Sequence, residues 1–210
     1  MNWISFYFYC LLFSVLSLVI LMYMIGTTNV LNRREKKSFY ISYCYLIAIF
    51  IIEFIGNYLD GNPKTILLLR IVKFLDYSMT PFVSIFFVKQ ITQMRRMEKV
   101  VLGILLANIL YEFLSMFFGW NFKITDEGVY QHGPTYFIYE VVFLLSMLYV
   151  ILSFYYYGKK HRKSNLISLI LIVTFTLAGI LLQELLPTKE VKTVMLSLTL
   201  GSFLLFIHYV

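Results

Sequence analysis

A chain of 210 residues with 60% hydrophobic residues, 14% charged residues and a mean hydropathy of +0.79 is too apolar for a soluble globular domain, in which roughly a quarter of the residues are charged. The composition therefore predicts an integral membrane protein. The net charge of +7 does not indicate nucleic-acid binding, because the basic residues gather at the ends of the apolar segments.

The apolar segments predict the fold class. One span needs about 20 mainly apolar residues, and clusters of charge separate seven such segments. They lie at residues 4–25, 38–58, 66–88, 100–119, 135–157, 165–186 and 191–210. We therefore expect an all-α membrane protein, a seven-transmembrane helix bundle that forms a single domain over residues 1–210.

Basic residues in the loops predict the orientation. Twelve lie in the first, third and fifth loops: Arg33, Arg34, Lys36, Lys37, Lys89, Arg95, Arg96, Lys99, Lys159, Lys160, Arg162 and Lys163. The other loops hold four: Lys64, Lys123, Lys189 and Lys192. Because loops rich in Lys and Arg stay in the cytoplasm, the N-terminus is predicted outside and the C-terminus inside.

The third predicted span, residues 66–88, is the most polar one. It carries Arg70, Lys73 and Asp76, and these charges, with Tyr77 and Thr80, cover about a third of the helix surface at 100° per residue. Charged side chains in a membrane face a bundle interior or a water-filled cavity, so this face must point inward. Pro81 removes a backbone donor and predicts a kink near the middle of this helix or a disturbed hydrogen-bond ladder. A kink there is either static or a place where the helix has two arrangements.

Other spans carry polar residues near their outer ends. Glu53 and Asn57 share one face of the second span, because they are four residues apart. Glu112 lies on the outer half of the fourth span, in a stripe with Asn108 and Ser115. In the fifth span, Glu140 shares a face with Tyr136 and Phe143, and in the sixth span, Gln183 shares a face with Thr176 and Gly179.

The longest external loop predicts a short β-hairpin between spans four and five. The segments FKIT and VYQH alternate in polarity on either side of Asp126, Glu127 and Gly128, and a glycine in such a turn is typical of hairpins. We expect this hairpin to lie over the outer mouth of the bundle.

The depth of the ionisable residues suggests a cavity rather than a channel. All of them fall in the outer half of their spans or near mid-depth: Glu53, Arg70, Lys73, Asp76, Glu112, Glu140 and Glu184. An ion path would need polar groups on both sides of the midplane, so the pattern favours a pocket that opens to the outside. Two alternatives stay open for the surplus acids: they are protonated, or they await a cationic or hydrogen-bonding ligand. Internal ion pairing that locks the bundle is a third interpretation.

The predicted ligand-binding residues are Glu53, Asn57, Arg70, Lys73, Asp76, Tyr77, Glu112, Glu140 and Gln183. No catalytic residue, metal site or cofactor is predicted. The histidines, His132, His161 and His208, are far apart and lack metal-ligand spacing. The sequence also contains no nucleophile motif, Walker loop or dinucleotide fingerprint, so we do not expect this segment to be an enzyme.

Two stretches resemble a known family. They are FLDYSMTPFVSIFFVKQ in the third span and DEGVYQHGPTYFIYEVVFLLSMLYVIL around the fifth. Together with seven spans and an external N-terminus, they resemble the N-terminal seven-transmembrane sensor region of bacterial histidine kinases and diguanylate cyclases, the GGDEF proteins. The resemblance implies a multi-pass protein of the bacterial cytoplasmic membrane and a homodimer. It also implies a small-molecule or membrane-borne signal, and an output domain after Val210 that is absent from this sequence.

The leading hypothesis is therefore a ligand-sensing module that transmits a signal through the seventh span. A small-solute transporter is the alternative, but transporters tend to show internal repeats and broken helices. The sequence shows no convincing repeat and only one proline inside a span. A scaffold whose charges merely pair with each other is the third hypothesis.

Overall fold

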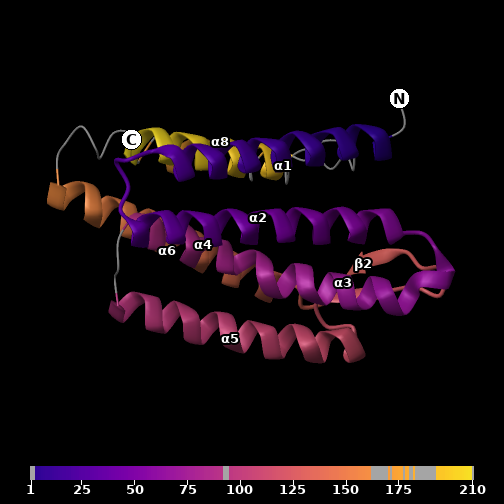
Figure 1. Ribbon diagram of the computed structural model, residues 1–210. Coiled ribbons are helices and arrows are strands. Elements are labelled where there is room, and N and C mark those ends of the chain that lie inside the picture. Colours follow the sequence, from indigo (N-terminus) through magenta and orange to yellow (C-terminus); the bar gives the residue numbers. More distant parts are fainter. Residues whose placement is uncertain are drawn as a thin grey trace. The chain divides into compact units, whose positions relative to one another are not determined.

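A computed structural model of the chain describes residues 3–91, 95–161, 170, 172–176, 178–179, 182 and 193–209. The described part is mostly helical (Figure 1). Its elements are α1 (Trp3–Thr27), α2 (Arg33–Leu59), η1 (Pro63–Thr65), α3 (Ile66–Met79), η2 (Thr80–Phe82), α4 (Val83–Ile91), α5 (Arg95–Phe118), β1 (Phe122–Ile124), β2 (Tyr130–His132), α6 (Tyr136–His161) and α8 (Thr193–Tyr209).

Five helical segments in the described part are long and apolar enough to cross a membrane. They are Phe6–Thr27, Arg33–Leu59, Pro63–Gln90, Arg96–Phe118 and Tyr136–Tyr157, and Thr193–His208 is a shorter apolar helix. These helices are compatible with a membrane helical bundle. Most of the sixth predicted span lies outside the described residues, as do Gln183 and Glu184, so seven spans and their orientation stay predictions.

The start of α2 shows how the sequence sets a helix boundary. The side chain of Asn32 accepts hydrogen bonds from the backbone N–H groups of Arg34 and Glu35, at 3.0 and 2.9 Å. In return, the Glu35 carboxylate accepts the Asn32 N–H at 2.9 Å. This reciprocal capping box satisfies donors that a helix end otherwise leaves unpaired, and it begins α2 directly after the preceding turn.

The chain divides into two compact units. The first unit contains Met1–Phe50, Phe86–Thr92 and Val150–Val210, and the second contains Ile51–Ile85 and Gln93–Tyr149. In the first unit, α1 contacts α8. The Tyr40 hydroxyl donates to the carbonyl of Met22 at 2.9 Å, and the Tyr43 hydroxyl donates to the carbonyl of Ser202 at 3.3 Å.

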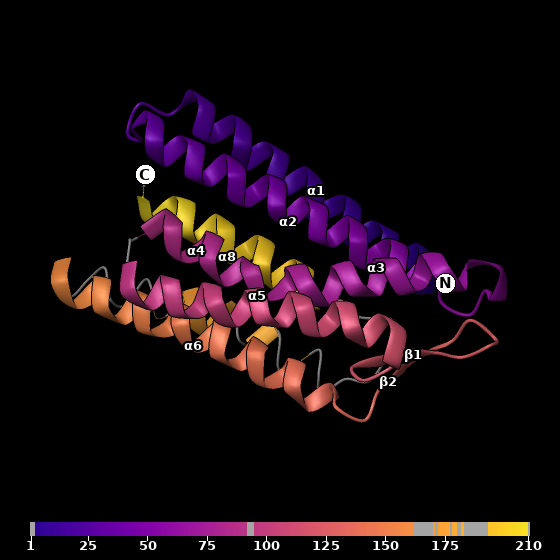
Figure 2. The same ribbon diagram turned by 90° about the horizontal axis from the view of Figure 1, so that it is seen from below.

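In the second unit, α3 packs against α5, and the two helices run in opposite directions (Figure 1). The strands β1 and β2 form a two-stranded antiparallel sheet in which Ile124 is opposite Tyr130. Figure 2 shows this sheet where the chain leaves α5, and β1 contacts both α3 and α5. The sheet occupies the segment for which a hairpin was predicted, and its position outside the membrane stays a prediction.

Pro81 interrupts the helix ladder of the third predicted span. Regular α3 ends at Met79, a 3₁₀ turn covers Thr80–Phe82, and α4 begins at Val83. Proline has no N–H to donate and clashes with the preceding turn, so a break at this position has a direct cause. The predicted disturbance of the ladder at Pro81 is therefore confirmed.

Candidate functional site

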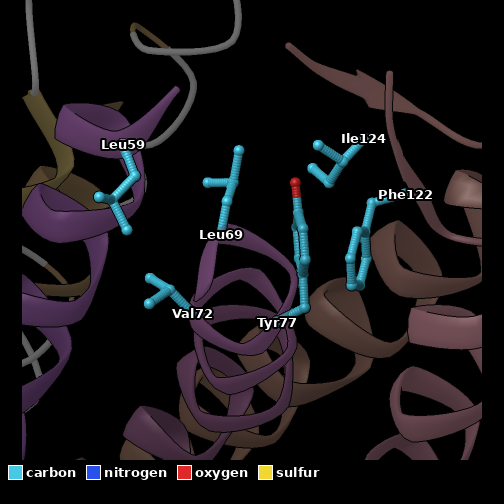
Figure 3. Close-up of a cluster of buried hydrophobic side chains, with 6 residues drawn as sticks. All are labelled: Leu59, Leu69, Val72, Tyr77, Phe122 and Ile124. Atoms are coloured by element: carbon cyan, nitrogen blue, oxygen red, sulfur yellow. The ribbon is translucent and has the colours of Figure 1, made fainter. Parts of the chain in front are cut away.

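An aromatic cluster surrounds Tyr77 in the second unit. Its ring stacks with Phe122 at 5.8 Å and with Tyr130 at 6.3 Å between centroids. It meets Tyr136 and Tyr139 edge to face, at 6.0 and 4.6 Å. Figure 3 shows the rings of Tyr77 and Phe122 side by side. These five residues, called the tyrosine cluster below, join α3, both strands and the start of α6.

Hydrogen bonds and apolar packing hold the tyrosine cluster together. The hydroxyls of Tyr77 and Tyr130 are hydrogen-bonded to each other. Leu69 and Val72 of α3 and Ile124 of β1 belong to the same buried core (Figure 3). Burial raises the pKa of the Tyr130 phenol, so its hydroxyl keeps its proton. The cluster therefore combines apolar ring surface with hydroxyl groups that exchange hydrogen bonds.

Lys73 lies one turn from Tyr77 on α3 and is only 6% exposed. Its ammonium nitrogen is 4.8 Å from the centre of the Tyr130 ring, a cation–π contact worth about 0.5–2 kcal/mol. The nearest carboxylate oxygen, Oδ2 of Asp76, is 4.0 Å away. In the described part of the chain, no acceptor lies within hydrogen-bond distance of the ammonium. Lys73 is thus a buried cation whose three donors are poorly satisfied.

Glu112 on α5 is completely buried, with an exposed fraction of 0%. Both carboxylate oxygens accept from the side-chain amide of Asn121, each at 2.7 Å. The Ser115 hydroxyl accepts the backbone N–H of Asn121 at 2.7 Å and that of Phe122 at 3.4 Å. This network fixes the turn between α5 and β1, and it places Glu112 beside the tyrosine cluster, because Phe122 follows Asn121 directly.

Three buried polar atoms near this network have no hydrogen-bond partner among the described residues. They are Oγ of Ser78, Oδ1 of Asn108 and Oδ1 of Asn121. Most buried polar groups in proteins are hydrogen-bonded, and each exception calls for an explanation. These three atoms come from α3, α5 and the turn after α5, and further exceptions in the described part belong to Ser14, Gln90 and Ser153.

The register of α3 against α5 sets Lys73 and Glu112 at one level. The side-chain amide of Asn108 donates to the carbonyl of Tyr77 at 3.1 Å, so these two residues face each other. Lys73 lies four residues before Tyr77, and Glu112 lies four residues after Asn108. Because the helices are antiparallel, Lys73 and Glu112 are displaced from the Tyr77–Asn108 contact by about one turn in the same direction along the helix pair. The two opposite charges nevertheless form no ion pair in the described structure.

Backbone contacts hold the hairpin on the loop between α2 and α3. The N–H of Gly61 donates to the carbonyl of Gly128 at 2.9 Å, and the Asp60 carboxylate accepts the N–H of Tyr130 at 2.8 Å. A Cβ on Gly128 would lie 2.5 Å from the carbonyl oxygen of Asn62, so only glycine permits this approach. The loop thereby fixes the position of Tyr130 over Lys73.

The structure brings only some of the predicted site residues together. Lys73, Asp76, Tyr77 and Glu112 gather at the tyrosine cluster, and Asp76 also accepts from the Thr80 hydroxyl at 3.3 Å. The remaining described ones are Glu53, Asn57, Arg70 and Glu140. Asn57 donates its side-chain amide to the carbonyl of Glu53 at 2.8 Å, and both side chains are partly buried. Arg70 is partly buried and forms no ion pair in the described part.

Glu140 corrects one detail of the prediction. It was expected to face the other charges, but its side chain is exposed. The neighbouring Tyr139 contacts Tyr77 instead, and successive residues of a helix point about 100° apart. An aromatic ring gains more from burial than a carboxylate does, so Tyr139 takes the inward position.

Sequence reasoning missed Asn121, Phe122, Tyr130 and Tyr139. Asn121 and Phe122 follow Gly119, whose positive φ of +68° reverses the chain after α5. A helical periodicity does not extend past such a reversal, so the partner of Glu112 was not visible. The alternation in VYQH was the available signal for Tyr130, since it placed Tyr130 and His132 on one face of a strand.

In the described part of the chain, no group of three His, Cys, Asp or Glu side chains is close enough to hold a metal ion. Comparison with protein-family models, curated proteins and solved structures finds no match for this chain.

Proposed function

We propose that this chain is the ligand-sensing transmembrane module of a bacterial signalling protein of the histidine kinase or diguanylate cyclase type. It binds a small-molecule or membrane-borne signal at the tyrosine cluster, between α3 and α5. The observation that carries this proposal is that Lys73 and Glu112 are both buried at one level of the second unit without pairing with each other.

Burying Lys73 and Glu112 has an energetic cost, and a functional role would explain why the protein keeps them there. Transfer of a charged group from water into a protein interior costs several kcal/mol, and only good pairing offsets it. A scaffold that used its charges for stability would bring Lys73 and Glu112 into contact. The closest carboxylate to Lys73 is instead 4.0 Å away, and Glu112 has a neutral amide as its partner. Charges kept apart in this way suit a ligand that contacts both.

The break at Pro81 suits transmission of the signal. Lys73 and Tyr77 lie on the last turns of α3, directly before the 3₁₀ turn Thr80–Phe82. A ligand that prefers one arrangement of this turn shifts the population towards it. In this proposal the last span carries the shift to a cytoplasmic signalling domain, with the N-terminus outside and two chains forming a homodimer in the bacterial cytoplasmic membrane.

A ligand screen on the purified chain in lipid nanodiscs tests the proposal. We expect one or more compounds from a panel of amino acids, sugars, carboxylates, amines and nucleobases to raise the midpoint of thermal unfolding. Lys73→Ala and Glu112→Ala should abolish this increase while the protein still inserts into the membrane. The matched control Glu127→Gln changes an exposed carboxylate of the hairpin turn and should keep it. Equal stabilisation of both site variants would contradict the proposed site.

The same preparation separates a sensor from a transporter. A sensor binds the stabilising compound without moving it across the membrane, whereas a transporter accumulates it. Proteoliposomes that contain the chain should therefore take up the labelled compound no faster than empty liposomes. Uptake that depends on the protein would replace the sensor with a small-solute permease.

A further inference from the structure

We infer that the ligand is a zwitterion of the free amino acid class, whose carboxylate binds the Lys73 ammonium and whose ammonium binds the Glu112 carboxylate. This inference rests on the proposed function and adds the chemistry of the ligand to it. It explains together two observations that internal packing leaves separate. Among the described residues, the buried Lys73 ammonium has no carboxylate oxygen closer than that of Asp76 at 4.0 Å, and the buried Glu112 carboxylate accepts from a neutral amide.

The Lys73 end of the site calls for an anionic acceptor. Its ammonium has the face of the Tyr130 ring at 4.8 Å and a carboxylate oxygen of Asp76 at 4.0 Å. A ligand carboxylate would replace the weak cation–π contact by charge-assisted hydrogen bonds, which are stronger. Tyr130 belongs to β2, so its displacement from Lys73 would also move the hairpin that the α2–α3 loop holds.

The Glu112 end calls for a cationic donor. Asn121 presents one side-chain nitrogen to both carboxylate oxygens at 2.7 Å, which leaves further lone pairs of the carboxylate without a donor. A ligand ammonium has three N–H donors and a full positive charge. It would meet the carboxylate as well as the buried oxygen of Asn121, which has no partner among the described residues.

The opposite signs of the charges at the two ends of the site favour a zwitterion over a simple ion. A ligand with only a positive charge would be repelled by Lys73, and one with only a negative charge would be repelled by Glu112 and Asp76. A zwitterion adds no net charge to a buried cluster, and each of its ends meets the opposite charge. Its side chain would lie against the rings of the tyrosine cluster, which offer apolar surface at the same level.

The geometry also predicts that the distance between the two charges of the ligand matters. Lys73 and Glu112 lie on facing helices at one level, and helix axes that pack together are about 8–10 Å apart. A ligand must therefore reach from one helix to the other. Glycine, β-alanine and γ-aminobutyrate form a series in which only the separation of the carboxylate and ammonium changes, and one member should bind best.

The first experiment measures thermal unfolding of the full chain in nanodiscs with the free L-amino acids, β-alanine and γ-aminobutyrate. The strongest stabiliser is then compared with its methyl ester, which lacks the carboxylate, and with its N-acetyl derivative, which lacks the ammonium. We expect the parent compound to raise the midpoint and both blocked compounds to leave it unchanged at the same concentration. Equal stabilisation by either blocked compound would overturn the inference.

The second experiment assigns each end of the ligand to a residue. Lys73→Met and Glu112→Gln should each weaken binding of the parent amino acid at least about thirtyfold, because each leaves one ligand charge unpaired. The controls Lys123→Met and Glu127→Gln make the same changes at exposed positions and should bind normally. The methyl ester should bind Lys73→Met more tightly than the unchanged protein, because the repulsive ammonium is gone. A purely structural role of Lys73 would produce no such reversal.

The outcomes distinguish this inference from the proposed function. A compound that is not a zwitterion but loses its effect in both site variants would keep the sensor and overturn the zwitterion. A panel in which no compound of any class stabilises the chain would overturn both. Stabilisation by an amino acid that persists in Lys73→Met and Glu112→Gln would place the ligand elsewhere and overturn the assignment.

Discussion

The two units of the chain bury polar groups in different ways. In the described part of the first unit, the buried polar side chains are neutral, and several hydroxyls donate to carbonyls one turn back in their own helix. Ser42 donates to Ser38, Thr199 to Met195 and Ser202 to Leu198, at 2.8–2.9 Å. The second unit buries Lys73 and Glu112 among aromatic rings. The first unit also buries neutral groups without a hydrogen-bond partner among the described residues, such as the side-chain amide of Gln90, whereas the second unit carries the larger electrostatic cost of buried charges.

The largest effect is expected when a charge is added to the first unit. Leu18 on α1 is fully buried, and Leu18→Glu would put a carboxylate into the interior of the first unit. Insertion of a charge at the centre of a membrane helix costs about 3 kcal/mol, and loss of packing adds to this. We expect little folded protein in detergent, measured by size-exclusion chromatography and thermal unfolding. The control Leu18→Met conserves volume and should fold.

A folded Leu18→Glu variant of normal stability would contradict the proposed difference between the two units. It would mean that both units accept buried charge, and that the burial of Glu112 needs no special explanation.

The next effect concerns the contact between the hairpin and the α2–α3 loop. Gly128→Ala would place a methyl group 2.5 Å from the carbonyl oxygen of Asn62, at a positive φ of +78°. We expect a loss of about 2–3 kcal/mol in the free energy of unfolding, from backbone strain and from separation of the hairpin from the loop. Gly61→Ala is the matched control. Gly61 also has a positive φ, +87°, but open space around its Cβ position. Gly61→Ala should therefore lower the free energy of unfolding by only about 1–2 kcal/mol.

The difference between these two alanine variants measures the close approach itself. Equal losses would show that the hairpin does not rest on the loop, and the position of Tyr130 over Lys73 would then need another cause.

The sequence predicted the helices better than it predicted the site. Apolar runs bounded by charge located α1, α2, α5 and α6, because the length of a membrane span and the cost of charge in it are strong constraints. Pro81 marked the break of α3 for an equally local reason. These features depend on neighbouring residues only, so they can be read along the chain.

The pairing of side chains depended on contacts between distant segments. The stripe that contains Asn108, Glu112 and Ser115 was visible, but Asn121 as the partner of Glu112 required the chain reversal at Gly119. The placement of Glu140 failed for a related reason. Periodicity shows which residues share a face of a helix. Which face is buried depends on contacts with other segments, here the edge-to-face contact between the rings of Tyr139 and Tyr77.

The smallest effect is expected for Lys73→Met. The sign of its change in the free energy of unfolding distinguishes a ligand site from a scaffold. Lys73→Met replaces a buried ammonium by an apolar side chain of similar length. If the ammonium held the second unit together, its loss would cost about 3–5 kcal/mol, as for a broken buried ion pair. Asp76, however, is 4.0 Å away and keeps the Thr80 hydroxyl at 3.3 Å, so it does not become an isolated charge. We therefore expect Lys73→Met to increase the free energy of unfolding by up to about 2 kcal/mol in the absence of ligand.

The control Lys123→Met, at an exposed position of β1, should change the free energy of unfolding by less than about 0.5 kcal/mol. Thermal unfolding without added ligand measures both variants. A gain at Lys73 would mean that the protein keeps a destabilising charge, as binding sites do, and a loss of several kcal/mol would mean that Lys73 is structural.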